Sequence, residues 1–167
     1  MNNIVLIGMP GSGKSTVGVL LAKMLGMNFI DTDLLIQQQE GMKLHEILEQ
    51  KGNAYFAAVE QAVNAAVTAE NTVIATGGSV VYGAQAMNHL CQIGRVVYLK
   101  VPLQELERRI KDFTTRGIQM RQNQTLADLL AERAPLYEKY ADITVRVGSA
   151  GLQGNAEKII RALSDFA

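Results

Sequence analysis

The sequence predicts an α/β fold, a parallel sheet of five strands with helices on both faces. Two observations lead to this expectation. Short apolar runs alternate along the chain with stretches whose apolar residues recur at helical spacing, which is the pattern of strand–helix–strand units. The first apolar run is continuous and ends at a glycine, as a strand buried on both faces does. With 167 residues, 48% of them hydrophobic, the chain suits one domain with a core of its own.

The elements are predicted in order from these patterns. The strands are expected at residues 4–7, 28–30, 72–75, 95–100 and 143–147. The helices are expected at residues 15–25, 34–40, 44–51, 54–70, 102–111, 125–140 and 156–166. Pro102 suits the first turn of its helix, and Thr125 with Asp128 resembles a capping box. Residues 112–124 are polar and without apolar periodicity, so they are predicted to form a mobile loop, and residues 148–154 a glycine-rich turn.

Composition narrows the classes of function. Lys and Arg balance Asp and Glu at 16 each, which argues against the basic surface that a nucleic-acid-binding protein needs. No apolar run reaches membrane-spanning length, and the first residues do not resemble a signal peptide. The single cysteine, Cys91, excludes an intrachain disulfide. We therefore expect a cytoplasmic monomer that acts on small molecules, without nucleic-acid or membrane partners.

The segment GMPGSGKS at residues 8–15 matches the phosphate-binding loop (P-loop) pattern in full, and it lies between a predicted strand and a predicted helix. Glycines let successive backbone N–H groups point at one anion, and the helix N-terminus adds partial positive charge. Lys14 can reach the β- and γ-phosphates of ATP, and the Ser15 hydroxyl can hold Mg²⁺. The remaining predicted nucleotide-binding residues of the loop are Gly11, Ser12, Gly13 and Thr16. The alternative is a glycine-rich turn without a ligand.

Two carboxylates, Asp31 and Asp33, follow the second predicted strand, where open α/β sheets bind ligands. If the strand continues through Asp33, both side chains point the same way. One carboxylate can then hold Mg²⁺ while the other accepts the proton of an attacking hydroxyl. The alternative is that Asp33 caps the next helix and Asp31 is a surface turn residue.

Several further segments carry a resemblance that covers nearly the whole chain. They are FIDTD at residues 29–33, ATGG at 75–78, Arg116 in the polar loop, RAPLY at 133–137 and AD at 141–142. With the P-loop, these segments make the chain resemble the shikimate kinases. The resemblance implies a single P-loop kinase domain over residues 1–167, with an acceptor-binding region at about 33–70 and a lid at about 112–124. It also implies transfer of the γ-phosphate of ATP to the 3-hydroxyl of shikimate.

The resemblance further implies a role for each matching residue. Lys14 and Arg116 are expected to act on the phosphates, Ser15 and Asp31 on Mg²⁺, and Asp33 at the acceptor hydroxyl. Gly77, Gly78 and Arg133 are expected to bind the acceptor, together with the neighbouring Ser79. Arg109 looks like the arginine that stacks on adenine, although Arg108 is a competing assignment. Arg116 and Arg121 could instead lie on a solvated loop, and Arg133 could form a surface ion pair.

The acceptor half departs from the family pattern. The arginine expected to help clamp the shikimate carboxylate is Ala57 here, and Ser79 replaces the third glycine of the acceptor loop. No Lys or Arg occurs between Gly52 and Gly94 to compensate. When a desolvated ligand carboxylate loses one of its two charged partners, the binding free energy typically weakens by about 2–5 kcal/mol.

Three other functions remain open from the sequence. A kinase of the same fold could act on a less negatively charged alcohol. A nucleoside monophosphate kinase would need arginines for the acceptor phosphate, and the first arginine of the chain is Arg95. A non-catalytic nucleotide-binding module would not need the catalytic residue types that this chain keeps.

Overall fold

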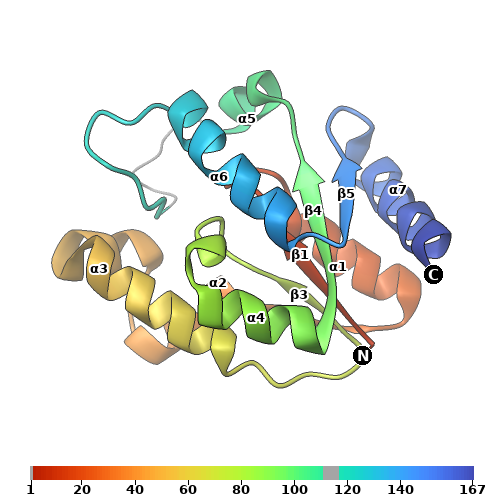
Figure 1. Cartoon of the computed structure of the whole chain (residues 1–167), viewed down its shortest axis with the longest axis horizontal. Helices are drawn as coiled ribbons and strands as arrows, with labels where there is room; N and C mark the ends of the chain where they lie inside the picture. The colour runs from red at the N-terminus through yellow and green to blue at the C-terminus, as the bar shows by residue number, and fades with distance from the viewer. Residues whose placement is uncertain (1, 111–116) are drawn as a thin grey trace.

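The five predicted strands form one parallel sheet in the computed structural model, which describes residues 2–110 and 117–167 (Figure 1). The sheet order is β2-β3-β1-β4-β5. The strands are β1 (Asn3–Ile7), β2 (Asn28–Asp31), β3 (Thr72–Ala75), β4 (Gly94–Lys100) and β5 (Ile143–Arg146). The register aligns Asp31 with Ala75 and Ala75 with Leu6. The carboxyl ends of β2, β3 and β1 therefore meet at one edge of the sheet.

Helices cover both faces, as predicted. They are α1 (Lys14–Leu25), α2 (Thr32–Glu40), α3 (Leu44–Ala65), α4 (Ala84–Ile93), α5 (Leu103–Arg109), α6 (Leu126–Tyr140) and α7 (Gly151–Phe166), with a 3₁₀ turn η1 (Val80–Tyr82). Helices α1 and α7 pack against each other, whereas α4 and α6 contact β4 and lie in front of the sheet in Figure 1. Within the described residues no helix is long and apolar enough to cross a membrane.

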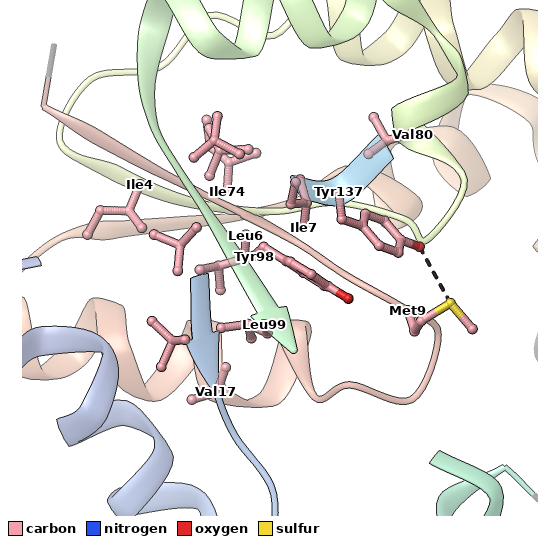
Figure 2. Close-up of a cluster of buried hydrophobic side chains, with 14 of the residues drawn as sticks. Ile4, Leu6, Ile7, Met9, Val17, Ile74, Val80, Tyr98, Leu99 and Tyr137 are labelled. Carbon is pink, nitrogen blue, oxygen red and sulfur yellow. Dashed lines mark hydrogen bonds between the residues drawn. The ribbon is translucent and has the colours of Figure 1, made fainter. Parts of the chain in front are cut away.

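The main core lies between the sheet and these helices. Leu6 and Ile7 of β1 are fully buried, as are Val96 and Val97 of β4. These strands are covered by helices on both faces, which explains why their sequences are continuous apolar segments. The hydroxyl of Tyr137 on α6 donates a 2.6 Å hydrogen bond to the Gly78 carbonyl, and it also lies 3.8 Å from the sulfur of Met9, the contact drawn in Figure 2.

A second, smaller apolar cluster joins α2 to α3. It consists of Ile36, Ile47, Phe56 and Val59. This cluster is separate from the main core, although α3 also packs against α4. Helices α2 and α3 coincide with most of the region predicted to bind the acceptor.

Some boundaries differ from the prediction. The helices expected at 44–51 and 54–70 are joined across a kink at Gly52, whose φ of 84° lies outside the helical region, and the second ends at Ala65. Helix α7 begins at Gly151 rather than near 156, so Gly151 and Gly154 of the expected turn lie in its first turn and Gly148 precedes it. Pro102 lies just before α5 instead of inside it. The capping box is confirmed, since the Asp128 N–H donates to the Thr125 hydroxyl and the Thr125 N–H to the Asp128 carboxylate.

Candidate active site

The P-loop turns directly from β1 into α1. Gly11 and Gly13 have φ of 78° and 88°, a left-handed conformation that costs glycine little and other residues more. Gly13 is the N-cap of α1 and makes no side-chain cap. The first N–H groups of the helix therefore have no capping side chain and face the loop, as an anion-binding helix terminus requires.

Lys14 is held inside this loop. Its Nζ donates to the carbonyl oxygens of Gly8 and Met9, at 2.7 and 2.8 Å, and to Ser12 Oγ at 3.2 Å. Burial lowers the pKa of Lys14 to about 8, and the negative charge of Asp33 opposes that shift. A nearby phosphate would stabilise the ammonium form.

The strand does not run through Asp33, so the condition under which both carboxylates would point the same way is not met, and the cap of the next helix is Asp31 and not Asp33. β2 ends at Asp31, and Asp33 belongs to the first turn of α2. Asp31 is the helix cap, since its Oδ1 accepts from the Asp33 and Leu34 N–H groups. Its Oδ2 accepts a 2.7 Å hydrogen bond from Ser15 Oγ. The two residues predicted to hold Mg²⁺ are therefore in contact.

Asp33 lies next to this pair and lines a cavity beside the P-loop, together with Lys14 and Ser15. Burial raises the pKa of Asp33 to about 6, with a further contribution from Asp31, while Lys14 acts in the opposite direction. Its Oδ1 is buried without a hydrogen-bond partner among the residues that the structure describes. A buried carboxylate oxygen without a partner is suited to accept a hydrogen bond from a ligand hydroxyl.

A cavity of about 500 Å³ lies on one side of the P-loop. Gly11, Gly13 and Thr16 line it, together with both candidate adenine residues, Arg108 and Arg109. Arg109 donates to the carbonyl oxygens of Gly11 and Gly148, and so bridges the loop to the segment after β5. Arg108 is more exposed and pairs with Glu105.

A second cavity, of about 220 Å³, lies on the other side of the loop. It is lined by Lys14 and Asp33, by Leu44, Phe56 and Glu60 of α3, by Gly77, Gly78 and Ser79, and by Gly117 and Ile118. The structure thus brings Asp33, Gly77, Gly78 and Ser79 together, as the sequence predicts. Lys51 lies elsewhere, paired with Glu40.

Glu60 also lines this cavity, although no role for it at the site was predicted from the sequence. Its side chain is almost fully buried, and Ser79 Oγ donates a 2.6 Å hydrogen bond to its Oε1. Burial raises the pKa of Glu60 to about 7, while the bond from Ser79 opposes the shift. A signal was present, because Glu60 follows Phe56 and Val59 at the spacing of the apolar face of a helix.

Arg133 is not a surface residue. It is 1% exposed, and it donates from Nη2 to the Gln119 carbonyl and from Nε to the Tyr82 hydroxyl. Its Nη1 lies 3.1 Å from the position that a Cβ would take on Gly78. Arg133 therefore lies next to Gly78 but does not line the cavity, whereas Gly78 and its neighbours in the loop after β3 do.

The described part of the predicted lid is residues 117–124, of which Gly117 and Ile118 line the second cavity. A Cβ on Gly117 would lie 2.5 Å from Leu44 Cβ, so this backbone packs closely on the start of α3. Asn53 donates to the Met120 carbonyl, and Arg121 pairs with Glu132 of α6. Arg116 and the rest of the predicted lid lie outside the described residues.

The comparisons with known proteins agree with this geometry. The sequence model of the family described as "Shikimate kinase" matches residues 10–164. The chain belongs to the shikimate kinase family. A shikimate kinase from Sulfurihydrogenibium sp. is 41% identical over 138 residues, covering 82% of this chain and 83% of the relative. One from Caldanaerobacter subterraneus is 39% identical over 165 residues, covering 97% and 96%.

A solved structure extends the likeness to three dimensions. Shikimate kinase from Acinetobacter baumannii in complex with shikimate superposes with a TM-score of 0.91 at 34% identity, covering 99% of this chain and 94% of that one. The chain is therefore a kinase with the P-loop kinase fold, from a family that uses ATP.

Proposed function

We propose that this shikimate kinase family member transfers the γ-phosphate of ATP to a hydroxyl of shikimate. The observation that carries the proposal is the cavity of about 220 Å³, in which the P-loop lysine and the partnerless Asp33 oxygen line the same space. An acceptor alcohol bound there would lie between a phosphate-binding group and a group that can accept its proton. The sequence similarity to named shikimate kinases supports the choice of acceptor.

In the nucleotide-binding half of the site, different residues would bind the phosphates, the base and Mg²⁺. ATP would place its phosphates on the loop N–H groups and Lys14, and its base in the cavity of about 500 Å³ beside Arg109. Ser15 and Asp31 would hold Mg²⁺, which supplies neutralisation of phosphate charge when bound. Magnesium needs few protein ligands in such sites. The 2.7 Å hydrogen bond between Ser15 and Asp31 supports this assignment, because it places two oxygen ligands side by side at the P-loop.

In the acceptor half, Asp33 would orient the attacking hydroxyl and accept its proton. Arg133, next to Gly78, would attract the acceptor carboxylate. Residues 117–124 would act as part of a lid that excludes water from the closed site. Gly77 and Gly78 line the cavity, and neither position has room for a side chain, since a Cβ on either would lie within 2.7 Å of a neighbouring side-chain atom.

A coupled assay tests the proposal. Purified protein is given ATP, Mg²⁺ and one acceptor at a time, from a panel of shikimate, other hydroxy acids and uncharged polyols. We expect kcat/KM to be highest for shikimate. A higher value for an uncharged polyol would identify the second candidate function, a kinase of the same fold acting on a less charged alcohol.

Ala57 is the observation that favours this second candidate. It stands where the family pattern has an arginine, so the site has one guanidinium fewer for an acceptor carboxylate. With shikimate as substrate, Ala57→Arg is expected to raise kcat/KM by about tenfold or more, since each 1.4 kcal/mol is worth tenfold. A parent value already above about 10⁴ M⁻¹s⁻¹, with no gain from the arginine, would show that this site needs no second guanidinium.

A further inference from the structure

The Glu60 carboxyl group has one satisfied and one unsatisfied oxygen. Oε1 accepts the Ser79 hydroxyl, whereas Oε2 is buried without a hydrogen-bond partner among the described residues. A Cβ built on Gly77 would lie 2.8 Å from Oε2 and 2.6 Å from Asp33 Oδ1. The two partnerless oxygens therefore flank the same glycine, at the wall of the acceptor cavity.

The hydrogen bond from Ser79 determines which oxygen of Glu60 would carry a proton. Oε1 is already an acceptor for Ser79, so a proton on the carboxyl group belongs on Oε2, which faces the cavity wall. The acid form also avoids placing two negative charges on either side of Gly77. A raised pKa, caused first by burial, is consistent with that form near neutrality.

We propose that Glu60, oriented by Ser79, is a specificity-determining residue that donates an Oε2–H hydrogen bond to the anionic acceptor. It would thus supply, as a neutral acid, a donor in a pocket wall where the family pattern has an arginine at position 57. Ser79 is a positioning residue, because its hydroxyl leaves Oε2 as the donor. The inference rests on the proposed function, since it takes shikimate as the acceptor.

The charged groups facing Glu60 come from three other helices. They are Asp33 of α2, which favours the acid form, and Arg133 of α6 and Lys14 of α1, which oppose it. When Glu60 loses its proton it loses its donor and repels an anion. Shikimate binding should therefore weaken as pH rises through about 7.

The test compares the parent with Glu60→Gln and Ser79→Ala. Glutamine keeps the shape, accepts from Ser79 through its oxygen and donates through its nitrogen at every pH. Shikimate affinity is measured by calorimetry at pH 6 and pH 8.5 with a non-hydrolysable ATP analogue, and kcat and KM are measured alongside. Thermal unfolding and analogue affinity serve as controls for folding and for the nucleotide half.

We expect parent affinity for shikimate to fall about tenfold or more between pH 6 and pH 8.5, and Glu60→Gln to remove most of that change. Ser79→Ala should weaken binding at pH 6, with a smaller effect on kcat than on KM. A parent and a Glu60→Gln variant with the same pH dependence would overturn the inference, as would no detectable binding at either pH. Binding with the expected pH dependence but without turnover would instead overturn the proposed phosphotransfer.

Discussion

At the scale of single residues, Asp31 shows how one side chain connects the fold to the chemistry. One of its oxygens caps α2 and the other binds the Ser15 hydroxyl. The cap fixes the carboxylate beside the P-loop before any ligand arrives. It also places Asp33 in the first turn of α2, where its side chain lines the cavity that contains Lys14.

This division predicts different effects for two conservative substitutions. Asp31→Asn keeps a good N-cap residue, so it should leave stability nearly unchanged and raise the Mg²⁺ concentration needed for half-maximal rate. Asp33→Asn should lower kcat about a hundredfold or more with little change in the KM for ATP. Steady-state kinetics over a magnesium titration measures both. Small and equal effects would indicate that both carboxylates are only structural.

Lys14 gives a second prediction at this scale. Lys14→Ala should lower kcat by about a thousandfold or more, because it removes the point charge next to the transferred phosphate. Lys23→Ala, on an exposed residue of the same helix, is the matched control and should keep the parent rate. Activity of Lys14→Ala within a factor of about two of the parent would refute the phosphotransfer role.

The sequence predicts the position of site residues that belong to short local motifs. It does not predict site residues that are brought together only by tertiary contacts. The P-loop and the pair Asp31 and Asp33 follow strands, so their place at the sheet edge was predictable. The hydrogen bond from Ser79 to Glu60 joins a loop after β3 to the middle of α3. No local pattern encodes such a contact. The sequence left open whether the strand runs through Asp33, and in the structure a helix begins one residue after the strand ends.

At the scale of elements, the acceptor cavity is lined by residues from elements that contribute to two different apolar clusters. One wall comes from α3, whose apolar cluster is shared with α2, and the others come from the P-loop and the loop after β3, which belong to the sheet. Residues 117–119 join these parts, because Gly117 packs on Leu44 and the Gln119 carbonyl accepts from Arg133. Closure of such a segment would bring both walls onto the acceptor.

Hydrogen exchange tests whether this segment responds to ligand. We expect amides of residues 117–124 to exchange faster in the free protein than with a saturating non-hydrolysable ATP analogue, because closure would order the segment over the site. Amides of the buried strand β1 should exchange slowly in both states and serve as the internal reference. Identical exchange of residues 117–124 in both states would count against a lid.

At the scale of the whole molecule, the buried acid contributes a pH-dependent cost to stability. The pKa of Glu60 is about 7 in the folded protein, against an ordinary value of 4.5. A folded-state pKa above the unfolded one means that the folded state binds more protons between these values. The contribution of Glu60 to the free energy of unfolding is then largest below pH 4.5 and is lost as pH rises to about 7.

Glu60→Gln should therefore be more stable relative to the parent at pH 8 than at pH 5. The expected difference is about 1–3 kcal/mol, from 1.36 kcal/mol per pKa unit. Urea unfolding at both pH values measures it, with Glu49→Gln, an exposed glutamate of the same helix, as control. A relative stability that does not change with pH would show that Glu60 titrates alike in both states.

The central position of β1 in the sheet has a consequence for how the chain reaches this structure. β1 is the first strand to be synthesised, yet its two neighbours are β3 and β4, with Ile4 aligned to Val73 on one side and to Arg95 on the other. Parallel pairings between distant segments form slowly, because a long loop must close before each contact stabilises the chain. During synthesis, β1 can gain its first neighbour only when β3 has emerged and its second only when β4 has emerged.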